Sequence, residues 1–307
     1  MALFKIVNKN LTPIDKAHFE LEKDIQKLTE DNLNTIFGLE FVCSEYQLQN
    51  LRIDTLAFDK ENKSFVIIEY KRDRSQSVID QGFSYLALML NNKADFILNY
   101  NECMKDNLKR NDVDWEQSRV MFIANNFTTY QRKAIEFKDL PIELWEVIKY
   151  ENDLVLFNEI KPAEVKESIK AVTKNTTIRN VSREVKKYSV DDHFGDNWDK
   201  TWEIYEKFRD RILEIDNRIV ESPKKIYIGF KIGNSVLCGI HVQKSKLVLW
   251  LGRTRPQDLK DPEKKVLYRK KSMEHYNQHI SDFYLKEESD VDYGIFLVRQ
   301  IYEKYFR

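Results

Sequence analysis

Apolar residues along the first 160 positions alternate between helical and strand spacing. A stripe at helical spacing that includes Ile25 and Leu28 predicts a helix over residues 19–37. Three strand-like runs follow, and the third contains the continuously apolar stretch from Phe65 to Ile68, which is typical of a strand buried on both faces. The predicted strands span residues 40–46, 51–58 and 64–71.

Helical spacing returns after the third strand. Residues 75–91 are predicted to form a helix, with Gln81 and Tyr85 one turn apart on one side. The order helix, three strands, helix, strand predicts a mixed α/β domain over residues 1–160. Its remaining predicted elements are a strand over 119–124, a short helix over 128–137 and strands over 142–149 and 154–160.

The second half of the chain has a different pattern. Residues 161–190 are polar, with little apolar periodicity; this pattern predicts a linker, with a marginal helix within it as an open alternative. The pattern over residues 191–307 predicts a second, smaller α+β domain. Its tryptophans, Trp198, Trp202 and Trp250, are expected to pack in the core. The predicted elements there are a helix over 198–215, strands over 225–231, 235–242 and 246–252, and a helix over 290–306.

The composition is that of a globular protein, since 42% of the 307 residues are apolar and 33% are charged. No apolar run approaches the ~18 residues that would span a bilayer, and the first residues lack the zones of a signal peptide. The eight glycines include no phosphate-binding motif, and the three cysteines include no metal-binding pair. We therefore expect a cytoplasmic protein with reduced thiols and no contact with a membrane.

Charge is balanced over the chain but uneven along it. The 50 Lys+Arg equal the 50 Asp+Glu, so any contact with nucleic acid must be local. Residues 1–172 carry 23 Lys+Arg and 29 Asp+Glu, whereas residues 173–307 carry 27 and 21. The C-terminal part is thus the better candidate to contact a polyanion.

A basic segment over residues 264–271 is the densest cluster of positive charge. Five cations surround Tyr268, which suits contact with backbone phosphates combined with aromatic stacking. A solvated charged segment is the alternative interpretation. The five cations are Lys264, Lys265, Arg269, Lys270 and Lys271.

Two carboxylates and a lysine stand where hydrolysis of a phosphodiester would need them. Asp54 lies inside the second predicted strand, and Glu69 and Lys71 end the third, on the same face because side chains alternate along a strand. The hairpin between these strands can bring Asp54 beside Glu69. A hard divalent ion such as Mg²⁺ (or Mn²⁺) would relieve the repulsion between the two carboxylates. The alternatives are an Asp54 paired with a nearby arginine and a solvated strand end at Glu69 and Lys71.

This arrangement resembles the PD-(D/E)xK nuclease superfamily, whose domains have a restriction-endonuclease-like αβββαβ core. The resemblance covers residues 1–160 and rests on Asp54 in LRID and on Glu69 and Lys71 in IIEYK. In that superfamily a glutamate on the first helix joins the site; here it would be Glu22, with Glu20 as second choice. More loosely, residues 190–307 resemble a domain of unknown function that accompanies such nuclease domains in bacterial proteins, some of them described as predicted transport proteins.

The resemblance implies a role for each matching residue. Glu22, Asp54, Glu69 and the Tyr70 backbone carbonyl would hold one or two Mg²⁺ ions, and Lys71 would position or activate the attacking water. Gln81 would help to orient that water. Tyr85 matches the aromatic that the superfamily often has on this helix and would contact the nucleic acid; helix packing is the alternative for both Gln81 and Tyr85. Apart from the resemblance, Arg72 and Arg74 follow the site directly and would contact phosphates, with solvation as the alternative.

The implied function is a metal-dependent endonuclease that acts on DNA rather than RNA, in defence against foreign DNA or in repair. A homodimer would be the simplest way to cut both strands of a duplex. The alternative is a catalytically dormant nuclease-like fold that serves as a nucleic-acid-binding or protein-binding module. The balanced charge and the acidic N-terminal half favour that alternative, because a domain that cuts DNA usually presents a positive channel.

Overall fold

A computed structural model describes residues 3–307 except 18, 20, 50, 72–76, 138, 162–166 and 277, and except the side chains of 170, 172 and 275. The chain divides into two compact units, Met1–Lys187 and Tyr188–Arg307. Each unit has its own buried cluster of apolar side chains.

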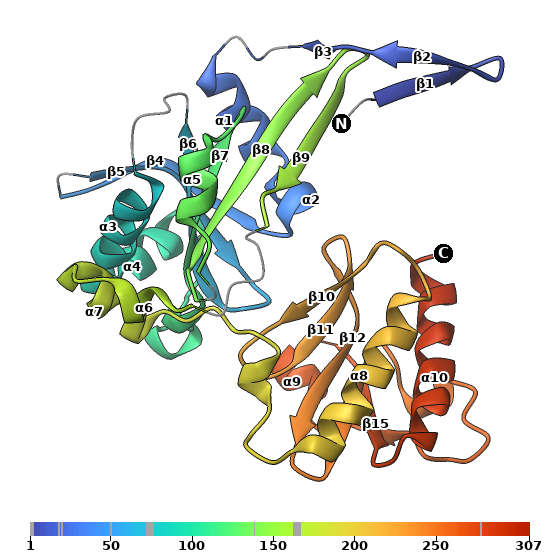
Figure 1. Ribbon diagram of the computed structural model, residues 1–307. Coiled ribbons are helices and arrows are strands. Elements are labelled where there is room, and N and C mark those ends of the chain that lie inside the picture. The colour runs from blue at the N-terminus through green and yellow to red at the C-terminus, as the bar shows by residue number, and fades with distance from the viewer. Residues whose placement is uncertain are drawn as a thin grey trace. The chain divides into compact units, whose positions relative to one another are not determined.

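The N-terminal unit is built on a mixed sheet (Figure 1). Its strands lie in the order β3-β8-β7-β6-β5-β4, with β9 paired to β8. β4, β5 and β6 form an antiparallel meander, and β6, β7 and β8 are parallel. The strands are β3 (Lys16–Ala17), β4 (Glu40–Leu48), β5 (Leu51–Asp59), β6 (Ser64–Lys71), β7 (Arg119–Ala124), β8 (Ile142–Tyr150) and β9 (Leu154–Glu159).

Helices cover both faces of this sheet. α1 (Glu22–Asp31) and α2 (Leu33–Phe37) pack on the face that carries Val66 and Ile68. α3 (Val78–Asn91) and α4 (Lys93–Met104) pack on the face that carries Phe65 and Ile67. The order α, β, β, β, α, β and the mixed α/β class confirm the predicted fold class. The stretch from Phe65 to Ile68 is completely buried, as its continuous apolar character predicts.

The predicted helix over residues 19–37 is wrong in one respect, because it is interrupted. α1 ends at Asn32, whose side-chain amide donates to the Leu28 carbonyl and whose N–H donates to the Thr29 carbonyl. Asparagine competes with the helix for backbone partners in this way, so the chain restarts as α2.

Several parts of the N-terminal unit were not predicted, the short strand β3 among them. A hairpin of β1 (Leu3–Val7) and β2 (Asn10–Ile14) precedes the sheet, and α4 follows α3 almost directly. The hairpin turns at Asn8 and Lys9, both with positive φ. Turns of this kind usually carry Asn-Gly, so the lysine conceals the signal. α5 (Thr129–Ala134) lies between β7 and β8, as expected for the predicted short helix.

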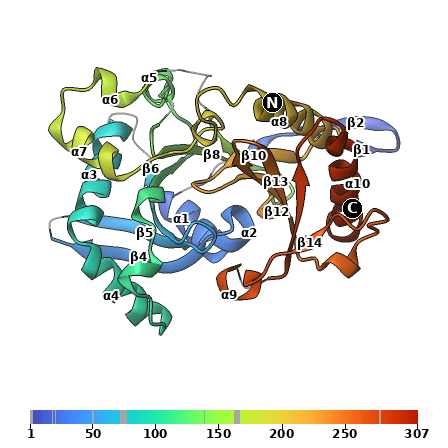
Figure 2. The same ribbon diagram turned by 90° about the horizontal axis from the view of Figure 1, so that it is seen from below.

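The segment expected to be a linker contributes helices to the N-terminal unit. α6 (Ile169–Val172) and α7 (Thr176–Glu184) lie within it, and α7 packs against α3 (Figure 2). Ile178 and Val181 of α7 are buried in the same cluster as the residues of α3. Because the segment carries few apolar residues, its periodicity did not reveal this packing. The first unit therefore continues to Lys187.

The C-terminal unit is an antiparallel sheet in the order β10-β11-β12-β13-β15-β14. α8 (Asp199–Leu213) and α10 (Ser289–Tyr305) bury one face of this sheet. The predicted strands and helices are present, and β10, β14, β15 and α9 (Ser272–Tyr276) are additional. The strands are β10 (Ile219–Pro223), β11 (Ile228–Ile232), β12 (Ser235–Gln243), β13 (Lys246–Gly252), β14 (Leu267–Tyr268) and β15 (Ile280–Leu285). No helix in the described part of the chain is long and apolar enough to cross a bilayer.

Candidate active site

The predicted site lies where β5 and β6 stop pairing. The two strands are paired as far as Thr55 and Ile68. One residue further along, the Oδ2 atom of Asp54 accepts a hydrogen bond from the Tyr70 backbone N–H at 3.0 Å. The Asp54 side chain thus takes the place of a backbone acceptor for the Tyr70 N–H. The Asp54 carboxylate is also close enough to Glu69 for its charge to raise the pKa of Glu69.

Glu69 and Lys71 point to the same side of β6, as their two-residue spacing predicts. Their ammonium and carboxylate groups form an ion pair, with Lys71 Nζ 3.3 Å from Glu69 Oε1. Both side chains are largely buried, at 12% exposed for Lys71 and 9% for Glu69. They share this side with Phe65 and Ile67, so both face α3.

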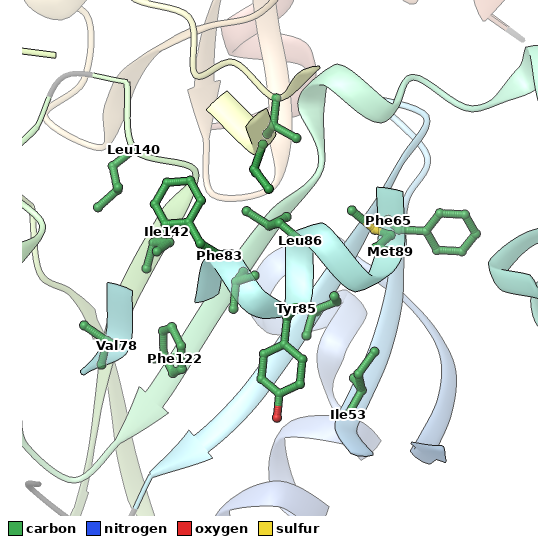
Figure 3. Close-up of a cluster of buried hydrophobic side chains, with 14 of the residues drawn as sticks. Ile53, Phe65, Val78, Phe83, Tyr85, Leu86, Met89, Phe122, Leu140 and Ile142 are labelled. Atoms are coloured by element: carbon green, nitrogen blue, oxygen red, sulfur yellow. The ribbon is translucent and has the colours of Figure 1, made fainter. Parts of the chain in front are cut away.

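α3 delivers two further polar groups to the carboxylates. Gln81 Nε2 donates to Glu69 Oε1 at 2.9 Å and lies 3.3 Å from the Tyr85 hydroxyl. The Tyr85 hydroxyl in turn donates to the Arg52 carbonyl at 3.0 Å. The Tyr85 ring is buried among apolar side chains, and its hydroxyl points away from them (Figure 3). The helix register thus fixes the amide and the hydroxyl beside the strand ends.

α3 approaches the sheet closely at Gly82. A Cβ at this position would come within 2.6 Å of Ile142 Cδ1 and 3.4 Å of a Phe122 ring carbon. The helix begins at the Ser77 cap, whose hydroxyl accepts the Asp80 N–H. A residue without a side chain at position 82 therefore permits the approach that brings the adjacent Gln81 to Glu69.

Two buried acceptor oxygens at this point receive no hydrogen bond from the residues that the structure describes. Glu69 Oε2 and Gln81 Oε1 are buried, and neither has a hydrogen-bond partner among the described residues. Buried polar atoms are normally paired, and an unmet acceptor needs an explanation. Both atoms can only accept hydrogen bonds or coordinate a cation.

Burial and neighbouring charge shift both acids in the same direction. Burial raises the pKa of Asp54, and the nearby Glu45 raises it further, against the opposing hydrogen bond from Tyr70. Burial also raises the pKa of Glu69, with the charge of Asp54 as the next cause, while Lys71 lowers it. The two carboxylates thus lack full compensation for their charges within the protein.

α1 reaches the same region from the other side of the sheet. Gln26 Nε2 donates to the Asp54 backbone carbonyl at 3.2 Å, and Glu30 accepts a hydrogen bond from the Thr55 hydroxyl. Glu22, the predicted metal ligand, starts α1 one turn before Gln26 on the same stripe. The sequence reasoning did not single out Gln26 or Glu30, and no signal distinguishes them from other polar helix residues.

The donor set fits a hard divalent cation in part. Asp54, Glu69 and the unmet oxygen of Gln81 offer the oxygen ligands that Mg²⁺ prefers, with water supplying the rest. Within the described residues, however, no three His, Cys, Asp or Glu side chains are grouped to hold one metal ion. Glu22 thus does not lie close to Asp54 and Glu69. The reason is that α1 packs on the opposite face of the sheet from Glu69.

The structure leaves several other predicted residues undescribed or assigns them to the second unit. Arg72, Arg74 and the alternative Glu20 lie outside the described residues. The basic segment belongs to the C-terminal unit, where it flanks β14. Its lysines are exposed, and Arg269 forms an ion pair with Asp282 at 2.9 Å.

The fold and these contacts define a two-unit protein with an α/β unit that carries a buried pair of carboxylates. The chain belongs to the same family as an uncharacterized protein of Haemophilus influenzae, with which it shares 45% identity over 252 residues. That alignment covers 82% of this chain and 83% of the relative. Residues 190–295 match a domain of unknown function, DUF5655, in agreement with the resemblance expected for the C-terminal part.

Three solved structures are similar to parts of the chain. A repair endonuclease from Pyrococcus abyssi is 19% identical, with 40% of this chain and 45% of that one covered and a TM-score of 0.23. EndoMS bound to double-stranded DNA is 17% identical, with coverages of 43% and 48% and a TM-score of 0.23. SfsA of Pyrococcus furiosus with Ca²⁺ is 12% identical, with coverages of 46% and 63% and a TM-score of 0.24. The chain spans less than two thirds of each, and scores this low carry no argument about function.

Proposed function

We propose that the N-terminal unit is a metal-dependent nuclease of the PD-(D/E)xK type that hydrolyses phosphodiester bonds, with DNA as its substrate. The observation that carries this proposal is the unmet Glu69 Oε2, buried beside Asp54 and flanked by Lys71 and Gln81. An acidic pair with raised pKa values and an adjacent lysine is the kind of cluster expected at a catalytic site. The choice of DNA, and of defence or repair as its setting, rests on the superfamily resemblance alone.

Asp54 and Glu69 would hold Mg²⁺ or Mn²⁺, which polarises a phosphoryl oxygen and lowers the pKa of bound water. The Tyr70 carbonyl is a further candidate ligand, because the N–H and C=O of one strand residue point to the same edge and the Tyr70 N–H faces Asp54. Glu22 would join them only if the end of α1 moved toward the carboxylates.

Lys71 and Gln81 would act on the substrate and the water. Lys71 Nζ, held 3.3 Å from Glu69, supplies a positive charge where negative charge develops on the phosphate. Gln81 donates one amide N–H to Glu69, and its buried oxygen, which has no donor among the described residues, can accept a hydrogen bond from the attacking water and orient it. Tyr85, whose hydroxyl is fixed by the Arg52 carbonyl, would hold Gln81 in place.

The basic segment of the C-terminal unit would add nonspecific contacts to phosphates. Its exposed lysines suit a backbone contact that does not depend on sequence. Arg72 and Arg74 remain candidates for the same role beside the active site. A homodimer would allow both strands of a duplex to be cut.

A dormant nuclease-like module is the second candidate function. One observation favours it: among the described residues, no third carboxylate lies with Asp54 and Glu69 to complete a metal site. Such a module would need no divalent ion, so it predicts that Mg²⁺ changes neither binding nor stability.

Cleavage of a mixed substrate panel tests the nuclease directly. Supercoiled plasmid, linear duplex, single-stranded DNA and RNA would each be incubated with Mg²⁺ or Mn²⁺ and the full chain. We expect the wild type to cut DNA and Lys71→Ala to lose about 10²–10³ in rate, the usual range for removal of one group that stabilises developing negative charge.

Lys93→Ala is the matched control, because Lys93 also forms an ion pair with a glutamate, Glu184, at 2.8 Å but lies on α4. This variant should cut at the wild-type rate. Equal cleavage by Lys71→Ala and wild type would overturn the assignment of the site, and no cleavage of any substrate by wild type would favour the dormant module.

A further inference from the structure

The sheet of the C-terminal unit has two dissimilar faces. α8 and α10 cover one of them, over a core that includes Phe208 and Phe283. On the other face, Val248, Trp250 and Ile280 form a separate small cluster. Trp250 is thus buried, as the sequence predicts, but outside the main core. We call this second surface the Trp250 face; its defining residues are Tyr227, His241, Lys246, Trp250, Arg269 and Tyr276.

Aromatic rings gather around Trp250. The His241 ring is stacked on it at 5.8 Å with 20° between the planes, and the Tyr227 and Tyr276 rings lie 5.2 and 5.9 Å away. Tyr227 rests on Gly239, where a Cβ would come within 2.8 Å of the ring. The backbone of β12 therefore leaves room for an aromatic layer on this face.

Cations lie on the rings of this layer. The Arg269 guanidinium carbon is 4.2 Å from the centre of the Trp250 ring, and Lys246 Nζ is 3.7 Å from that of Tyr284. Such contacts are attractive because a ring face is electron-rich. Asp282 compensates Arg269, and the exposed Lys270 follows directly in the basic segment. Arg269 thus links the Trp250 face to the basic segment.

One hydrogen-bond donor on this surface is unmet. Trp250 is 7% exposed, and its indole Nε1 is buried without a hydrogen-bond partner among the described residues. A buried donor is normally paired, so this indole N–H is an exception that needs an explanation. Tyr276, whose ring contacts that of Trp250, is 41% exposed.

We propose that the Trp250 face binds single-stranded nucleic acid, with an unpaired base stacked on Tyr276 and phosphates held by Lys246 and the basic segment. Positive grooves with exposed rings are the usual way to bind single strands, because every base has a face that can stack. A duplex buries its base faces and would leave the aromatic layer unused. The inference rests on the proposed function only in taking nucleic acid as the partner.

Binding without cleavage tests this proposal. A fluorescein-labelled 12-nucleotide DNA strand would be titrated with the full chain in EDTA, and affinity followed by anisotropy. Tyr276→Ala should weaken binding by about fivefold to 150-fold, the range for loss of one stacked base, while Tyr276→Phe keeps wild-type affinity. Phe296→Ala is the matched control, since Phe296 is also 41% exposed but lies on α10.

Salt dependence separates the two kinds of contact. Lys246→Gln should reduce the slope of log K against log salt by about 0.7, the value for one lost phosphate contact with a single strand, whereas Tyr276→Ala should leave the slope unchanged. An acidic peptide would use the cations but not the stacking. Polyglutamate that competes as well as an unlabelled strand would therefore overturn the proposal.

Equal affinity of Tyr276→Ala and wild type, an equal loss in Phe296→Ala, or no binding by wild type would each overturn the inference as well. Cleavage is not a readout here, so the two proposals fail separately. If the wild type binds the strand through Tyr276 but cuts no substrate, only the nuclease proposal is contradicted. If the wild type cuts DNA and Tyr276→Ala binds the strand as tightly as wild type, only the proposal for the Trp250 face is contradicted.

Discussion

At the scale of single residues, Asp54 and Glu69 are held in a place that disfavours their charge. Both are substantially withdrawn from water, and the pKa of each is raised, first by burial. Lys71 compensates only part of this, and Glu69 Oε2 has no donor among the described residues. Carboxylates arranged in this way destabilise the metal-free chain and gain the most from a bound cation.

Replacement of Asp54 by asparagine should therefore stabilise the metal-free chain at neutral pH. Asparagine keeps an oxygen that can accept the Tyr70 N–H but removes the charge. The folded pKa of Asp54 lies above the value of 3.8 for a free side chain, so the unfolded state loses its proton first and wild-type stability falls as pH rises from about 4 through the raised pKa.

Urea unfolding in EDTA at pH 3 and pH 7 measures this effect. Asp54→Asn should match wild type at pH 3 and exceed it at pH 7, while the exposed Asp106→Asn should match wild type at both. A variant less stable than wild type at pH 7 would show that the Asp54 charge is compensated in the folded state.

The residues of the site differ in how far they could be predicted. Glu69 and Lys71 follow from strand alternation, and Asp54 follows from the hairpin that pairs β5 with β6. Glu22 could not be placed, because helical spacing shows which stripe of α1 is buried but not which face of the sheet receives it. The unmet oxygens of Glu69 and Gln81 depend on tertiary contacts that no local pattern records.

At the scale of elements, α3 sets the geometry of the site. Its Gly82 packs against Ile142 of β8 and Phe122 of β7, and the residue before it reaches Glu69. Elements with a continuous apolar run, such as β6 and β7, were predicted with the observed bounds. The hairpin β1–β2 was not, because its turn lacks glycine and much of its surface is exposed.

A larger residue at position 82 should disturb both stability and the site. Gly82→Val would force its side chain into Ile142 and cost about 1–3 kcal/mol, the usual range for overpacking a core. Ser84→Val, at an exposed position of the same helix, carries the same β-branched side chain without the clash. Denaturant unfolding should show a loss for Gly82→Val well beyond that for Ser84→Val; equal losses would mean that α3 adjusts without strain.

At the scale of the whole molecule, the division at Lys187 changes the charge of the parts. Residues 1–187 carry 28 Lys+Arg and 30 Asp+Glu, and residues 188–307 carry 22 and 20. The larger charge difference expected from the sequence arose because residues 173–187, which carry five Lys+Arg and one Glu, were counted with the C-terminal part. Neither unit is strongly charged, so the proposed contact with nucleic acid would have to come from local surfaces, as we propose for the Trp250 face.

Separate cores predict separate folding. The buried clusters of the two units share no residue, so fragments 1–187 and 188–307 should each unfold cooperatively on their own. Circular dichroism during heating would measure this. A fragment 1–160, which lacks α7, should lose its cooperative transition or melt lower, because Ile178 and Val181 would leave the core open. A fragment 1–160 as stable as 1–187 would restore the boundary expected from the sequence.

Calorimetric titration of the full chain with Mn²⁺ tests the proposed metal site without any choice of substrate. We predict saturable binding to wild type that is lost in Glu69→Gln and retained in Glu184→Gln, whose carboxylate pairs with Lys93 on the surface of the same unit. Absence of Mn²⁺ binding by wild type, or equal binding by Glu69→Gln, would contradict a metal-dependent nuclease at Asp54 and Glu69.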